Sequence, residues 1–111
     1  MAQDRVYEAI GFLEQCLRER GLTISKIILF GSQAKGRATE ESDVDIAIIS
    51  EDFSNKDIFE RAILTKDAEI MTMKKFMLPL DIITMTTKEL ESGTSIMSEY
   101  VRDGEVVMER V

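Results

Sequence analysis

The stretch LFGSQAKGRATEESDVDIAI, residues 29–48, places two apolar segments on either side of a polar loop. The first apolar segment ends at Gly31 and Ser32, and the second begins with Asp43 and Asp45, which lie two positions apart. Carboxylates at the start of a buried strand cost free energy unless a positively charged partner lies beside them. The stretch therefore predicts two strands that meet at a site attracting positive charge.

The composition predicts one folded domain over residues 1–111, because 44% of the residues are hydrophobic and 32% are charged. The formal net charge of −7 argues against a protein that coats long nucleic acid, whose affinity comes mainly from Lys and Arg. The chain has one cysteine and no histidine. These counts exclude an internal disulfide, Ser-His and Cys-His nucleophiles, and most zinc sites.

The sequence also predicts a cytoplasmic protein. No stretch approaches the roughly 20 apolar residues that span a membrane. The first residues, MAQDRVYEAI, carry acids where a secretory leader would carry basic residues and an apolar run. A single cysteine agrees with a reducing compartment.

Helices are expected on the apolar spacing and the capping residues. Residues 4–20 predict a helix with Asp4 as N-cap and Gly21 as its end, and Ser32–Gly36 predicts a short one. A longer helix is expected to begin at Asn55 or Asp57 and to end near 73–75. Two shorter ones are expected at 88–91 and 95–103. The side chains expected to face the core are Val6, Ile10, Leu13 and Leu17 in the first helix, and Ile58, Phe59, Ala62, Ile63 and Ile70 in the longer one.

Strands are expected at 25–30, 43–50 and 80–85, and EVVME near the end predicts a short edge strand. If Gly31 and Asp45 share one site, the first two strands are antiparallel. If Asp81 joins that site, the third strand is parallel to the second, and the intervening helix supplies the crossover. The predicted fold class is α/β (α+β), a small mixed sheet of three to four strands with helices packed mainly on one face.

Asp43, Asp45 and Asp81 are the candidate catalytic and metal-binding residues. Residues two apart in a strand point to the same face, and two adjacent carboxylates favour a divalent cation such as Mg²⁺. That pair alone is more typical of a solvated strand end, but Asp81 interrupts the apolar run of the third strand. Three carboxylates suit two Mg²⁺ ions, of which one binds a triphosphate and the other activates a hydroxyl. Asp81 could also accept the proton of that hydroxyl.

Gly31 and Ser32 are the candidate phosphate-binding residues. Glycine allows a close approach of the backbone, and a following helix would direct its N–H groups at the phosphate. Lys35 and Arg37 lie just beyond and can balance phosphate charge. The alternative is an ordinary strand-to-helix turn with two solvated cations.

The combination of Gly31-Ser32, ten intervening residues, Asp43-Val44-Asp45 and a later Asp81 resembles the nucleotidyltransferase superfamily that includes DNA polymerase β. Within it, the chain is similar to the minimal nucleotidyltransferase (MNT) proteins over its whole length. The resemblance implies that Gly31, Ser32 and Lys35 hold the nucleotide and that the three aspartates bind Mg²⁺. Where the family often has arginine, this chain has Gln33 and Lys35, which could weaken triphosphate binding.

The resemblance further implies transfer of AMP from ATP to a hydroxyl, and an antitoxin role toward a small helical HEPN toxin. An acidic chain suits a basic, RNA-cleaving partner. Two alternatives stay open. One is an adenylyltransferase for a small molecule such as an aminoglycoside, with a homodimer forming the cleft. The other is a non-catalytic antitoxin that blocks its partner by binding alone.

Overall fold

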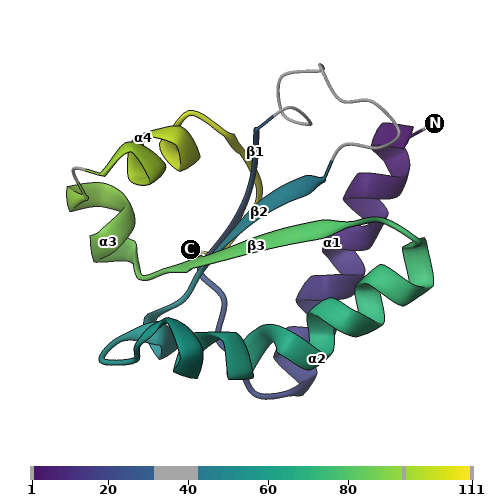
Figure 1. Cartoon of the computed structure of the whole chain (residues 1–111), viewed down its shortest axis with the longest axis horizontal. Coiled ribbons are helices and arrows are strands. Elements are labelled where there is room, and N and C mark those ends of the chain that lie inside the picture. The colour runs from purple at the N-terminus through teal and green to yellow at the C-terminus, as the bar shows by residue number, and fades with distance from the viewer. Residues whose placement is uncertain (1, 32–42, 94, 111) are drawn as a thin grey trace.

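The computed structural model describes residues 2–31, 43–93 and 95–110 (Figure 1). The short helix expected from Ser32 lies outside these ranges, as do Gln33, Lys35 and Arg37. In chain order the described elements are α1 (Ala2–Glu19), β1 (Lys26–Phe30), β2 (Val44–Ile49), the 3₁₀ turn η1 (Glu51–Phe53), α2 (Ile58–Phe76), β3 (Leu80–Met85), α3 (Thr87–Ser92), α4 (Ile96–Arg102) and β4 (Glu105–Glu109).

The strands form one mixed sheet in the order β3-β2-β1-β4. β1 is antiparallel to both β2 and β4, whereas β2 and β3 are parallel. Helix α2 makes the crossover between the parallel strands, as a parallel connection requires. The expected fold class is therefore confirmed, with EVVME as the fourth strand at one edge.

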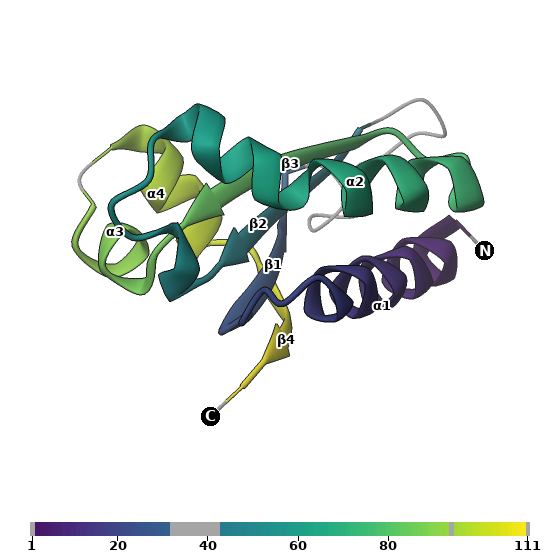
Figure 2. The ribbon, with the colours of Figure 1, turned by 90° about the horizontal axis from the view of Figure 1, so that it is seen from below.

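The two long helices cover one face of the sheet, and the two short helices lie over the other (Figure 2). Alternation along the strands divides the core accordingly. Val44, Ile46 and Ile48 of β2 belong to the apolar cluster that includes the side chains of α1 and α2. Ala47 and Ile49 belong to the second cluster, with Leu90 of α3 and Val101 of α4.

Helix α1 is amphipathic, and its expected core residues Val6, Ile10, Leu13 and Leu17 are all buried. The prediction that Asp4 is the N-cap was wrong, because the helix begins at Ala2 and Asp4 lies in its first turn. An acid there still interacts favourably with the helix dipole. Gly21 ends this segment with a φ of +89°, a conformation that favours glycine. No helix of the described ranges, α1 included, is long and apolar enough to cross a bilayer.

Helix α2 begins as expected, but its orientation differs from the expectation. Asp57 is the N-cap, and its carboxylate accepts a hydrogen bond from the Glu60 N–H at 2.8 Å. The side chains expected to face inward are instead exposed: Ile58, Phe59, Ala62, Ile63 and Ile70. The buried face consists of Thr65, Ala68 and Thr72.

The size of the side chains explains this orientation. The space between the sheet and α1 is already filled by large residues such as Leu13, Ile46 and Phe53, which are all fully buried. A helix that packs closely over them needs small side chains on its inner face. The buried Thr72 hydroxyl donates to the Ala68 carbonyl at 2.7 Å, so its burial leaves no unsatisfied donor.

Substitutions on the two faces of α2 test this orientation. Ile63→Ser should change the free energy of unfolding by less than about 0.5 kcal/mol, because the side chain is 75% exposed. Ala68→Leu should destabilise by about 1–3 kcal/mol, because the added atoms overpack a filled core. Urea denaturation followed by circular dichroism measures both values. The reverse order would show that the helix presents its other face to the sheet.

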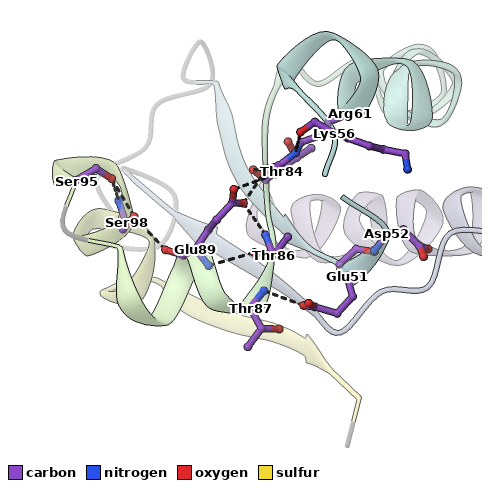
Figure 3. Close-up of polar contacts among 11 residues, drawn as sticks. Glu51, Asp52, Lys56, Arg61, Thr84, Thr86, Thr87, Glu89, Ser95 and Ser98 are labelled. Atoms are coloured by element: carbon purple, nitrogen blue, oxygen red, sulfur yellow. Dashed lines mark hydrogen bonds and ion pairs between the residues drawn. The ribbon is translucent and has the colours of Figure 1, made fainter. Parts of the chain in front are cut away.

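An ion pair joins α2 to α3 (Figure 3). The Arg61 guanidinium donates to both carboxylate oxygens of Glu89, at 2.7 and 2.9 Å. Glu89 also accepts from the Thr86 N–H at 2.9 Å, in the capping box of α3. Hydrogen bonds from Arg61 are the main cause that lowers the pKa of Glu89 below its usual value.

The lowered pKa of Glu89 predicts a pH-dependent contribution to stability. The folded state binds the proton less readily than the unfolded state, so the contribution is present above the ordinary carboxyl pKa and disappears as the pH falls through the folded pKa. Glu89→Gln should therefore destabilise by about 1 kcal/mol at pH 7. Urea titrations of both proteins should converge below about pH 4. An equal difference at all pH values would contradict the role of the charge.

Candidate active site

The strand register brings two of the three candidate carboxylates, Asp45 and Asp81, side by side. Asp45 of β2 is paired with Phe30 of β1 on one side and with Asp81 of β3 on the other. Directly paired residues on neighbouring strands project to the same face. That face is the one covered by α3 and α4, because Ala47 and Ile49 share it with Asp45. Asp43 is exposed immediately before β2.

Gly31 lies directly against Asp45. It is buried, has a φ of +75°, and a Cβ atom there would lie 2.2 Å from the Asp45 Oδ2 atom. Only glycine combines this backbone conformation with this close approach. The chain therefore leaves β1 immediately over the carboxylate of Asp45. Ser32 and Lys35, the other two predicted nucleotide-binding residues, lie outside the described ranges.

The electrostatics of Asp45 reflect its neighbours. Burial raises its pKa above the usual value, and repulsion from Asp81 and then Asp43 raises it further. Two nearby negative charges disfavour the ionised form of a carboxylate, and a bound cation stabilises that form. The three aspartates therefore create a field that favours positive charge at this end of the sheet.

Sequence reasoning missed one acidic residue beside this group. Glu69 of α2 is half-buried, and its pKa is raised by burial and secondarily by the charge of Asp81. Within the described ranges its side chain has no hydrogen bond or ion pair. No sequence signal separates Glu69 from the other acids of α2, because its position depends on how the helix lies beside β3.

The donor chemistry fits Mg²⁺. Carboxylate oxygens are hard ligands, and Mg²⁺ is usually held by one or two carboxylates together with phosphates and water. In the part of the chain that the structure describes, no three acidic side chains are placed to bind one ion by themselves. The aspartates can thus supply part of a coordination shell that nucleotide oxygens complete.

The chain belongs to the nucleotidyltransferase domain family, whose model matches residues 11–103. The matched segment contains Gly31 and all three aspartates.

Two proteins of Methanocaldococcus jannaschii match parts of the chain. One is a candidate protein adenylyltransferase, MJ1305, which is 40% identical over 53 residues, covering 48% of this chain and 36% of that protein. The other, MJ0604, has the same designation and is 64% identical over 28 residues, covering 25% of this chain and 28% of that protein. The aligned segments thus span well under half the length of these relatives.

Solved structures share the fold. A candidate nucleotidyltransferase from Sulfolobus solfataricus superposes with a TM-score of 0.70 at 18% identity, covering 97% of this chain and 84% of that one. A toxin–antitoxin complex with AMP-PNP superposes with a TM-score of 0.63 at 18% identity, covering 99% of this chain and 75% of that one. A mutant of the toxin–antitoxin MntA-HpeT superposes with a TM-score of 0.60 at 17% identity, covering 87% of this chain and 70% of that one. At these identities the likeness concerns the fold.

Alanine substitutions at two glycines test the close approach at Asp45. Gly31→Ala should destabilise by at least about 1–2 kcal/mol, because alanine is strained at positive φ and its methyl group collides with the carboxylate. Gly11→Ala is the matched control, since a Cβ there has no atom within 4 Å. Because Gly11 is in the middle of α1, the control should stabilise by about 0.5–1 kcal/mol. Thermal or urea unfolding measures both, and equal effects would contradict the described turn.

Proposed function

We propose that this protein transfers AMP from ATP to a hydroxyl group on a partner protein and acts as the antitoxin of a toxin–antitoxin pair. The observation that carries the proposal is the pairing of Asp45 with Asp81 directly beside the Gly31 turn. It joins a group of carboxylates to a place where a phosphate can approach the backbone closely. Membership of the nucleotidyltransferase domain family supports the same reaction class.

The nucleotide is held at the end of β1. Gly31 allows the close approach of the triphosphate, Ser32 donates a hydrogen bond to it, and Lys35 balances its charge. Lys35 provides a point charge and cannot make the paired hydrogen bonds of an arginine, so we expect modest affinity for the triphosphate. The structure with AMP-PNP is consistent with a nucleotide substrate for this fold.

Asp43, Asp45 and Asp81 would hold Mg²⁺, in one or two ions. When bound, Mg²⁺ neutralises phosphate charge and lowers the pKa of the acceptor hydroxyl. Asp81 stands at the open edge of the group and accepts the proton of that hydroxyl. The hydroxyl oxygen then forms a bond to the α-phosphorus of ATP. The bond from that phosphorus to the bridging oxygen breaks, and pyrophosphate leaves.

The partner is proposed to be a small helical toxin of the HEPN type. Two of the solved structures with this fold are toxin–antitoxin assemblies. The net charge of −7 would attract a basic protein that cleaves RNA. Neutralisation would follow from the added AMP, which places a bulky anionic group on the toxin.

Removal of one carboxylate tests the catalytic role. Asp45→Asn keeps the side-chain shape but removes the charge, and we expect transfer of AMP to fall by about 10²-fold or more. The readout is intact-mass spectrometry of the product of the neighbouring gene, after its incubation with this protein, ATP and Mg²⁺. Asp67→Asn, on the exposed face of α2, is the matched control and should retain full transfer.

Other outcomes separate the alternative functions. If Asp45→Asn still neutralises the toxin in cells, neutralisation is steric and the protein is a binding antitoxin. If no protein acceptor gains mass but an aminoglycoside does, the substrate is a small molecule. Chelation of Mg²⁺ with EDTA should abolish transfer, and an unchanged rate would remove the proposed metal role.

A further inference from the structure

The outer edge of β3 has backbone groups available for pairing. The N–H groups of Val44 and Ser50 donate to the carbonyls of Pro79 and Met85, at 2.8 and 2.9 Å. In a regular parallel ladder, the backbone N–H and carbonyl groups of the odd-numbered residues of β3 therefore bond to β2. The backbone groups of the even-numbered residues are directed away from β2, toward the open edge of the sheet. The Thr84 carbonyl, which this alternation directs away from β2, accepts a hydrogen bond from Arg61 at 3.3 Å. Within the described ranges, nothing bonds to the N–H or carbonyl of Ile82.

The two edges of the sheet are protected to different degrees. β4 has Glu105 and Glu109 at its ends, and its pairing with β1 contains a register shift between Ile27 and Ile28. Charges and bulges are the usual means of preventing unwanted pairing. β3 pairs with β2 without a shift, and from Ile82 to Met85 it carries no charge, proline or glycine. Its edge is suited to receive another strand.

A groove with a volume of about 450 Å³ runs along this edge, between α2 and β3. Ile58 and Ala62 of the helix and Ile82 and Ile83 of the strand give it apolar walls. Ile58 is 73% exposed, and the apolar surface continues onto Phe59, which is 77% exposed. Exposed apolar surface of this kind, next to an open strand edge, is typical of a binding site for another chain.

The charges that line the groove indicate what it binds. Arg61 is neutralised by the carboxylate of Glu89, as Figure 3 shows. Within the described ranges, the lining charges without an ion pair are Lys56 and the half-buried Glu69. Lys56 lies beside Arg61, whose Nε–H donates to the Lys56 carbonyl, whereas Glu69 lies near Asp81. Asp81, one residue before Ile82, adds a second negative charge at that end. A segment with a Lys or Arg side chain near Glu69 is therefore electrostatically complementary.

We propose that this groove, which we call the β3 groove, binds an extended segment of the acceptor protein as an additional strand on β3. A basic side chain of the segment lies beside Glu69. The hydroxyl to be modified lies at Asp81, the neighbour of Ile82 along the strand, so main-chain pairing sets its position. This inference rests on the proposed function, because it concerns the acceptor of the same site.

A synthetic peptide tests the proposal. The probe is the heptapeptide Thr-Val-Lys-Tyr-Lys-Val-Thr, which is blocked at both ends. A Lys directly on either side of the Tyr projects to the face opposite the hydroxyl, which is the face over which α2 and Glu69 lie. The comparison peptide has Glu in place of both Lys. We expect the Lys peptide to bind the full chain, and the Glu peptide to bind about tenfold more weakly or worse. Equal affinity of the two peptides would overturn the electrostatic part of the proposal.

Amide hydrogen exchange locates the binding. In the free protein the Ile82 N–H should exchange rapidly and the Ile83 N–H, bonded to β2, should exchange slowly. The Lys peptide should slow exchange at Ile82 and leave Ile83 unchanged, whereas β4 should show no change. Protection of β4 or of α4 instead of Ile82, or no protection at saturating peptide, would overturn the proposal.

Substitution of Glu69 gives a second, independent measurement. Glu69→Lys should weaken binding of the Lys peptide about tenfold or more and strengthen binding of the Glu peptide. Glu19→Lys, at the exposed end of α1, is the matched control for the change of charge and should alter neither affinity by more than about twofold. If Glu69→Lys lowers both affinities equally, the residue has no charge-specific role and the assignment fails.

The two proposals fail in different ways. Protection of Ile82 without AMP transfer to the peptide would support the β3 groove and count against the proposed reaction. AMP transfer without protection of Ile82 would support the reaction and overturn the β3 groove.

Discussion

The close contact between Gly31 and the carboxylate of Asp45 is the constraint on which the rest of the site depends. A Cβ atom at residue 31 would lie 2.2 Å from the Asp45 Oδ2 atom, so the turn at the end of β1 exists only because the residue is glycine. Burial raises the pKa of Asp45, and repulsion from Asp81 and then from Asp43 raises it further. A backbone turn that a phosphate can approach and a carboxylate that favours a cation are thereby placed side by side, and the proposed reaction uses both.

Helix α2 contributes to two surfaces, the buried core on its inner side and the β3 groove on its outer side. Its small inner residues, among them Ala68 and Thr72, allow it to pack closely on a core that other elements have already filled. Its large apolar residues consequently face outward, where Ile58 borders the β3 groove. This exposed apolar surface is what the proposed acceptor segment would cover.

The acidic residues near the site form two groups with different proposed roles. Asp43, Asp45 and Asp81 repel one another and favour a metal ion, whereas Glu69 stands beside them at the edge of the sheet. The proposed reaction uses the first group for the nucleotide, and the proposed groove uses Glu69 for the acceptor. The parallel pairing of β2 and β3 connects the two, because Asp81 belongs both to the carboxylate group and to the free edge.

The sequence by itself determined the strands and the family, because strand alternation, glycine at the turn and the spacing of the aspartates are local properties of the chain. The mixed sheet followed from the sequence only with the assumption that Gly31, Asp45 and Asp81 share one site. The sequence also determined the core face of α1, where apolar spacing and burial agree. Only the tertiary structure decided which face of α2 is buried, since that depends on how much space α1 and the sheet leave. It alone placed Glu69 beside Asp81 and left the edge of β3 open, because these relations join residues whose proximity follows from packing and strand order rather than from any local pattern.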